Sequence, residues 1–194
     1  MTMTAVTINF NPIITISDDQ FYQLCCANPD IKFERNPEGE IIIISPTGGE
    51  TGNRNAEINA ELGIWNRRTK LGQVFDSSTC FNLPQGGDRS PDVAWVRQAK
   101  WDSLTPEQKE KFPPIAPDFV LELLSPSDSL AATQAKMQEY IASGVQLAWL
   151  IHRKNRRVEI YRPGQLPEIL ETPATLSGES ILPGFVLNLD IVWG

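Results

Sequence analysis

The stretch that decides the fold is Pro117-Asp118-Phe119-Val120-Leu121-Glu122-Leu123-Leu124-Ser125, in which one carboxylate stands inside an apolar run. Apolar residues on both sides of Glu122 predict a strand that is buried on both faces. Burying an ionised carboxylate is costly unless the group is paired or binds a metal ion. Glu122 therefore pairs with a core arginine or lysine, points outward from an edge strand, or binds a cation.

A second apolar strand carries a second acid. The run Pro91-Asp92-Val93-Ala94-Trp95-Val96 predicts a strand that opens on Asp92. Two apolar strands with one acid each favour a site at which Asp92 and Glu122 converge on one cation.

The segment after the Glu122 strand brings a lysine to the same height. The run from Ser125 to Ser129 offers N-cap residues for a helix that extends to about Gly144. Glu122 lies roughly 10 Å of strand before Ser125, and Lys136 lies roughly 10 Å of helix after Ser129. The two charged groups meet if the helix folds back along the strand. Otherwise, Lys136 is a surface lysine whose aliphatic stem covers apolar neighbours.

Five motifs stand in a fixed order along the chain: Ser45-Pro46-Thr47-Gly48-Gly49-Glu50, Ser90-Pro91-Asp92-Val93, Glu122-Leu123-Leu124-Ser125-Pro126-Ser127-Asp128, Lys136 with Tyr140, and Gly144-Val145 before a strand. Together they resemble the restriction-endonuclease-like PD-(D/E)XK superfamily. The resemblance is to its short single-domain bacterial branch, long filed as a domain of unknown function, and it extends from about residue 15 to the C-terminus.

The resemblance implies an α/β (α+β) fold with a mixed central β-sheet flanked by helices, an N-terminal helix and β-hairpin, and a C-terminal β-hairpin. It implies metal-assisted hydrolysis of phosphodiester bonds in DNA, with Asp92, Glu122 and Lys136 as catalytic residues. Mg²⁺ or Mn²⁺ would be held by Asp92, Glu122 and the main-chain carbonyl of Leu123, which are hard oxygen ligands. Because cutting both strands needs two sites, the resemblance also implies a homodimer.

One position departs from the superfamily pattern, which asks for a lysine two residues after the acid. That position is Leu124 in this chain, and the branch it resembles moves the lysine to the following helix, where Lys136 stands. A decayed site would show the same missing lysine. The alternative is therefore a catalytically degenerate nuclease-fold module that binds nucleic acid or protein.

A helix predicted from about residue 51 to residue 69 adds candidate acids. Superfamily members often take a further acid from this helix, so Glu57, or Glu61 in its place, is a candidate metal ligand. Each is equally explained as a solvated glutamate on an amphipathic helix. The single histidine, His152, makes a catalytic triad or a histidine-based zinc site hard to build.

Composition sets the outer limits of the prediction. The 194 residues are 41% hydrophobic, which is enough for one core, so we expect a single domain over residues 1–194 with residues 1–14 as a loose or extended arm. Three cysteines without a metal-ligand spacing predict a reducing compartment. No apolar run is long enough to span a membrane, and no signal-peptide pattern opens the chain, so we expect a cytoplasmic protein.

The net charge of −7 argues against nucleic-acid binding, which usually needs a basic surface. Local positive charge offsets this in part, because Arg153, Lys154, Arg156 and Arg157 crowd one turn. Such turns are also common as solvated loops. A proline-rich stretch that contains Trp101, Phe112 and Ile115 is a candidate apolar contact for the homodimer. Packing within one chain explains these three residues as well.

The remaining patterns predict an element order. We expect helices at residues 17–27, 51–69, after Thr105 and at 130–143, and strands at 31–35, 40–44, 74–76, 79–83, 92–96, 119–123, 146–151, 158–161, 167–171 and after Leu182. The strands at 31–35 and 40–44 form one predicted hairpin, and those at 158–161 and 167–171 form a terminal one.

Overall fold

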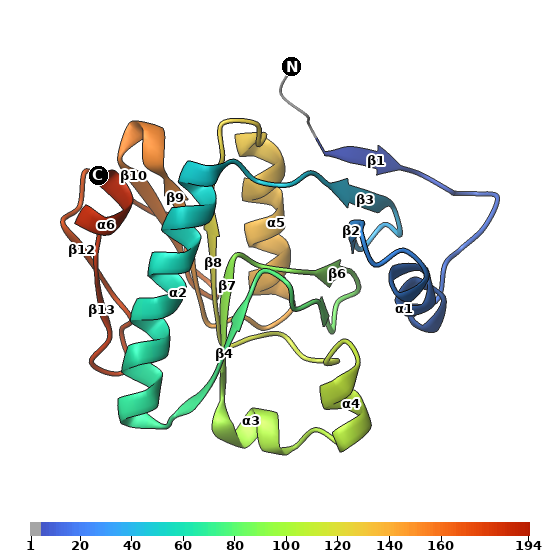
Figure 1. The fold of residues 1–194 in the computed structure, drawn as a ribbon, viewed down its shortest axis with the longest axis horizontal. Helices are drawn as coiled ribbons and strands as arrows, with labels where there is room; N and C mark the ends of the chain where they lie inside the picture. Colours follow the sequence, from blue (N-terminus) through green and yellow to red (C-terminus); the bar gives the residue numbers. More distant parts are fainter. Residues whose placement is uncertain (1–4) are drawn as a thin grey trace.

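A computed structural model describes residues 5–194, and Figure 1 shows a central β-sheet flanked by helices beside a smaller β-sheet. The central sheet has six strands, in the order β11 (Glu168–Glu171), β10 (Arg157–Tyr161), β9 (Leu147–His152), β8 (Phe119–Leu123), β7 (Val93–Arg97) and β4 (Gly72–Asp76). Only β8 and β9 run parallel, since a helix connects them, and the other neighbours are antiparallel. The predicted mixed sheet is confirmed.

Two helices cover the central sheet from opposite faces (Figure 1). Alternate residues of a strand point to opposite faces, so Val93 and Trp95 join one core cluster while Ala94 and Val96 join another. Helix α2 (Gly49–Thr69) packs Ile58, Leu62 and Trp65 into the first cluster. Helix α5 (Leu130–Ala142) buries Met137 and Tyr140 in the second cluster and packs against β9 and β10.

The smaller sheet is built from segments in the N-terminal half of the chain. Its five strands lie in the order β1 (Val6–Ile8), β3 (Ile41–Ile44), β2 (Lys32–Arg35), β6 (Asp88–Arg89) and β5 (Phe81–Asn82), and α1 (Asp18–Ala27) packs beside them through Phe21. Strands β2 and β3 form the predicted N-terminal hairpin. Of the predicted arm, residues 6–8 form β1 and pair with β3, while residues 1–4 lie outside the described residues.

The remaining elements are short. They are α3 (Gln98–Asp102), α4 (Pro106–Glu110), the 3₁₀ turn η1 (Arg153–Asn155), β12 (Thr175–Ser177), β13 (Val186–Asn188) and α6 (Asp190–Trp193). The terminal hairpin predicted from the sequence is β10 with β11. Trp101, Phe112 and Ile115 pack against core clusters of their own chain. Within residues 5–194, no helix has the length and apolar character needed to cross a membrane.

Candidate active site

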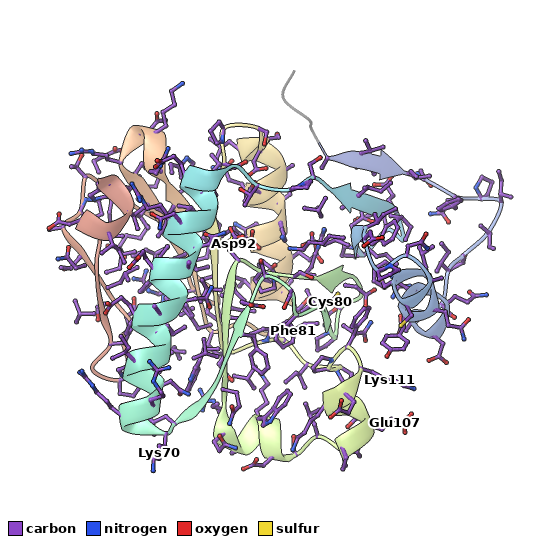
Figure 2. All side chains as sticks on the ribbon, in the orientation of Figure 1. Lys70, Cys80, Phe81, Asp92, Glu107 and Lys111 are labelled. Atoms are coloured by element: carbon purple, nitrogen blue, oxygen red, sulfur yellow. The ribbon has the colours of Figure 1, made fainter. Side chains whose placement is uncertain are left out.

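The two predicted acids lie next to each other at one end of the central sheet. Strands β7 and β8 pair antiparallel with Val93 opposite Leu121, a register that places Asp92 beside Glu122. The main-chain N–H of Leu123 donates a hydrogen bond of 2.8 Å to Oδ2 of Asp92. In Figure 2, Asp92 lies between α2 and α5, and both helices send side chains to this place.

Helix α5 supplies the lysine at the height that the sequence predicts. The ammonium of Lys136 lies 2.8 Å from Oε1 of Glu122, and the hydroxyl of Tyr140 donates to the same oxygen at 2.8 Å. Lys136 and Tyr140 are four residues apart and so share one face of the helix. Glu122 is thus a core carboxylate that pairs with a lysine, and it lies on an interior strand of the sheet.

A third carboxylate, which sequence reasoning missed, completes this group. Glu34 on β2 is buried, and its Oε1 lies 2.9 Å from the ammonium of Lys136. The same carboxylate accepts hydrogen bonds from the main-chain N–H of Ser90 at 3.1 Å and from Nη1 of Arg89 at 3.0 Å. The sequence places Glu34 after Phe33 in a predicted strand, but only the pairing of β2 with β6 brings it to the site.

Helix α2 presents amides to the site. Nδ2 of Asn55 donates to Oδ1 of Asp92 at 2.9 Å, and Nδ2 of Asn59 donates to the main-chain oxygen of Asp92 at 3.2 Å. Glu57 and Glu61 are both exposed, and Glu57 lines a surface hollow beside α6. The structure therefore brings Asp92, Glu122 and Lys136 together and leaves the two candidate helix acids outside this group.

Comparison with family models matches residues 18–190 to Uma2, a family described as "Putative restriction endonuclease". The chain belongs to the Uma2 family. Among solved structures, a protein from Anabaena variabilis ATCC 29413 described as a "putative nuclease belonging to DUF820" is similar in fold, with a TM-score of 0.77 at 21% identity over 93% of this chain and 97% of that one. The fold is thus restriction-endonuclease-like, as the sequence predicts. No curated protein matches the chain.

The site of this Uma2 chain holds more negative than positive charge. Four carboxylates lie within one connected group, and Lys136 and Arg89 are the only cations that contact them among the described ion pairs; the acids are Glu34, Asp92, Glu122 and Glu139. Since an uncompensated buried charge is unfavourable, the excess favours protonation of an acid or binding of a cation.

The individual pKa values show where the excess charge falls. Burial raises the pKa of Glu122 to about 7, and the nearby carboxylates of Asp92 and Glu34 add to this, while Lys136 opposes it. Burial also raises the pKa of Asp92, against the hydrogen bond from Leu123. Burial acts in the same direction on Glu34, but Lys136 and Arg89 outweigh it and lower the pKa of Glu34 to about 2.

The lysine stays positively charged in this environment. Burial alone would lower the pKa of Lys136, but Glu122 and Glu34 outweigh it and raise the pKa above its usual value. This agrees with the expectation that opposite charge offsets desolvation. The site therefore offers a fixed ammonium beside a carboxylate that protonates readily.

The donor set fits a hard divalent cation. No three His, Cys, Asp or Glu side chains in residues 5–194 are grouped to hold a metal ion. The candidate ligands are two carboxylates, Asp92 and Glu122, with the carbonyl of Leu123. Oδ1 of Asn55 is a further oxygen beside Asp92, buried and without a hydrogen-bond partner. Oxygen donors and excess negative charge are the environment that Mg²⁺ and Mn²⁺ prefer.

Proposed function

We propose that this chain is a Mg²⁺- or Mn²⁺-dependent endonuclease that hydrolyses phosphodiester bonds of DNA in the cytoplasm. The observation that carries the proposal is the contact between Lys136 and Glu122, because it joins an ammonium to the acid that stands beside Asp92. Membership of the family described as "Putative restriction endonuclease" supports the same reaction class.

In this proposal, Asp92, Glu122 and the carbonyl of Leu123 would hold the ion, which would supply polarisation of the scissile phosphate and a lower pKa for its bound water. Lys136 orients the attacking water or balances the negative charge that develops on the phosphate. Asn55 and Asn59 fix the orientation of Asp92 from the side of α2, as ligand-supporting residues commonly do.

The basic turn η1 supports DNA as the substrate. Strands β8 and β9 are parallel, with Leu123 opposite Ile151, so η1 follows the same end of the sheet at which the acids lie. Lys154 and Arg156 are exposed there. We propose that these side chains contact phosphates on either side of the bond to be cut.

We also propose that the protein acts as a homodimer, since cutting both strands needs two sites. Trp101, Phe112 and Ile115, the dimer contacts predicted from the sequence, pack within their own chain. In contrast, Val6, Ile8 and Ile13 near the N-terminus are exposed. Light scattering at micromolar concentration should give twice the chain mass of 21.6 kDa. A mass equal to one chain would refute the dimer.

The experiment that tests the function measures ion binding and cleavage together. Mn²⁺ should raise the thermal midpoint because it binds only the folded state, and Asp92→Ala should remove that rise. Nicking of plasmid DNA in Mn²⁺ should disappear in Glu122→Gln and persist in Glu159→Gln, a matched change at another buried glutamate.

The outcomes separate the proposal from its alternative. Cleavage that persists equally in Glu122→Gln points to a contaminating nuclease and contradicts the assignment. DNA binding without ion binding or cleavage would instead identify a degenerate nuclease-fold module, for which Leu124 in the superfamily's lysine position is the sequence argument.

A further inference from the structure

The ammonium of Lys136 is shared by two carboxylates from different parts of the fold. Glu122 comes from β8 in the central sheet, and Glu34 comes from β2 in the smaller sheet, 102 residues before the lysine. Both contacts are short, 2.8 and 2.9 Å. The proposed function uses Glu122 and Lys136 and gives no role to Glu34.

Glu34 is held more firmly than Glu122. Its Oε1 accepts from the main-chain N–H of Ser90, and its Oε2 pairs with Arg89, which is itself fixed by Glu139 at 2.6 Å. Glu34 is only 2% exposed, so water does not replace these donors. Its carboxylate therefore has a fixed position and holds the ammonium of Lys136 at 2.9 Å.

The two carboxylates have opposite consequences for a bound cation. An ammonium that pairs with Glu122 alone competes with a divalent ion for the same oxygens. A second, immobile carboxylate lets the ammonium keep a partner while the oxygens of Glu122 turn to the ion. Such an anchor also restricts the rotamers that the long lysine stem would otherwise sample.

We infer that Glu34 is a positioning residue, which anchors the ammonium of Lys136 as a second carboxylate partner and thereby leaves Glu122 free for a divalent cation. The inference rests on the proposed function, since it assigns Glu122 to the ion. It predicts that Glu34 acts on ion binding through Lys136 and not through the ion itself.

The test is a double-mutant cycle on Mn²⁺ affinity, measured by titration calorimetry on the full chain. Glu34→Gln should weaken Mn²⁺ binding about tenfold, the lower end of the range for residues that support ligands. Lys136→Met should bind Mn²⁺ as tightly as the wild type or more tightly. The double variant should match Lys136→Met, because without the lysine there is nothing for Glu34 to anchor.

Glu159→Gln is the matched control, since Glu159 is also 2% exposed and lies against α5 through Gln134. It should leave Mn²⁺ affinity unchanged. If Glu34→Gln does not fold, Glu34→Asp keeps the charge with a shorter reach and should weaken binding by a smaller factor through the same lysine.

The Mn²⁺ affinities test the proposed function and the role of Glu34 separately. A wild-type chain that does not bind Mn²⁺ overturns the proposed function and this inference with it. A wild-type chain that binds Mn²⁺, with unchanged affinity in the Glu34 variant that folds, overturns the role of Glu34 alone. If Glu34→Gln weakens Mn²⁺ binding equally in the wild-type and Lys136→Met backgrounds, Glu34 has a general structural role, which also overturns the inference.

Discussion

Two buried glutamates lie in one cross-strand row of the central sheet and differ in what surrounds them. Leu150 on β9 is opposite Glu122 on β8 and opposite Glu159 on β10. Both glutamates contact α5, one through Lys136 and Tyr140 and the other through Gln134. Both are nearly inaccessible to solvent, with exposed fractions of 8% and 2%.

Donors surround Glu159. Nε2 of Gln134 lies 3.0 Å from each of its oxygens, the hydroxyl of Tyr161 donates at 2.6 Å, and Arg157 pairs with it at 3.5 Å. Burial and the bond to Glu159 raise the pKa of Tyr161, so its hydroxyl remains a donor. Glu159 and its donors therefore stabilise the packing of α5 against β10.

Glu122 has donors and competing acids. Lys136 and Tyr140 bond to one of its oxygens, while Asp92 and Glu34 lie close enough to raise its pKa. A buried carboxylate is not in itself evidence of a site, since proteins satisfy many buried carboxylates with internal hydrogen bonds. A buried carboxylate beside other carboxylates, with too few cations, is the feature that indicates ion binding.

The largest expected difference between the two regions is in catalysis. Lys136→Met keeps the aliphatic stem and removes the charge, so plasmid nicking should fall about 10²–10³-fold. Gln134→Met, one half-turn away on α5, should leave nicking unchanged and lower the unfolding free energy by about 1–3 kcal/mol, because it removes both hydrogen bonds that Nε2 of Gln134 makes to Glu159. Nicking assays and denaturant unfolding on both variants check this.

A control follows from the superfamily's ordinary lysine position. Adding Leu124→Lys to Lys136→Met should recover part of the activity if a lysine there reaches the same point, although Leu124 packs against the core cluster under α5. Full activity in Lys136→Met alone would remove the lysine from the mechanism. The two glutamates would then differ only in their acid neighbours.

The next effect is on stability and depends on pH. The pKa of Glu122 in the folded chain is about 7, above its ordinary 4.5, so the folded state holds this proton more tightly and stability falls as pH rises through that window. Without metal, the wild type should therefore lose about 3 kcal/mol of unfolding free energy between pH 4.5 and pH 8, at about 1.4 kcal/mol per pKa unit. Glu122→Gln lacks this loss, so its unfolding free energy should rise by that amount relative to wild type over the same range.

Glu34 gives the opposite dependence and serves as an internal check. Its folded pKa of about 2 lies below 4.5, so its contribution is present above pH 4.5 and is lost as pH falls toward 2. Glu159→Gln should destabilise the chain, because Gln134, Tyr161 and Arg157 lose a shared acceptor. Unfolding in EDTA at several pH values measures all three. A flat pH dependence for Glu122→Gln minus wild type would contradict the excess-charge argument.

Much of this architecture is predictable from local patterns. The hairpins, the sheet strands and the helices α2 and α5 follow from apolar periodicity and caps, and the meeting of Lys136 with Glu122 follows from rise per residue. Short elements were missed: β6 has two residues and β1 has three exposed ones, so neither has a periodicity to detect.

The site was predictable only where its members are close in sequence or share a known motif. Asp92, Glu122 and Lys136 belong to ordered motifs, whereas Glu34 reaches the site because β2 pairs with β6, a long-range contact that no local pattern specifies. The side of α2 that faces Asp92 could not be predicted from the sequence either. Asn55 and Glu57 are two positions apart, and only the packed helix decides which one turns inward.

A smaller effect tests that choice on α2. Asn55→Ala should weaken Mn²⁺ binding about tenfold, because the amide that orients Asp92 is lost together with an unbonded oxygen beside it. Glu57→Gln should leave the affinity unchanged, since Glu57 is exposed beside α6. Calorimetric titration of both variants decides the matter. Weaker binding in Glu57→Gln alone would restore the helix acid as a ligand.

The smallest effect concerns the edge between the two regions. The turn η1 joins β9 to β10 and carries exposed Lys154 next to the strand that holds Glu159. If DNA follows this turn, Lys154→Gln should reduce the slope of log affinity against log salt by about one unit, measured in Ca²⁺ by fluorescence anisotropy. Lys70→Gln, at the far end of α2 from Asp92 in Figure 2, should leave the slope unchanged.

Arg157 tests whether the partners of Glu159 contact DNA. Its guanidinium pairs with Glu159 and Glu171, so it should be unable to release counterions from DNA, and Arg157→Gln should leave the salt slope as in wild type. A slope reduced as much as in Lys154→Gln would place a DNA contact inside the Glu159 group. That group would then be part of the substrate surface, and the division between a structural and a functional glutamate would hold for Glu159 itself but not for its partners.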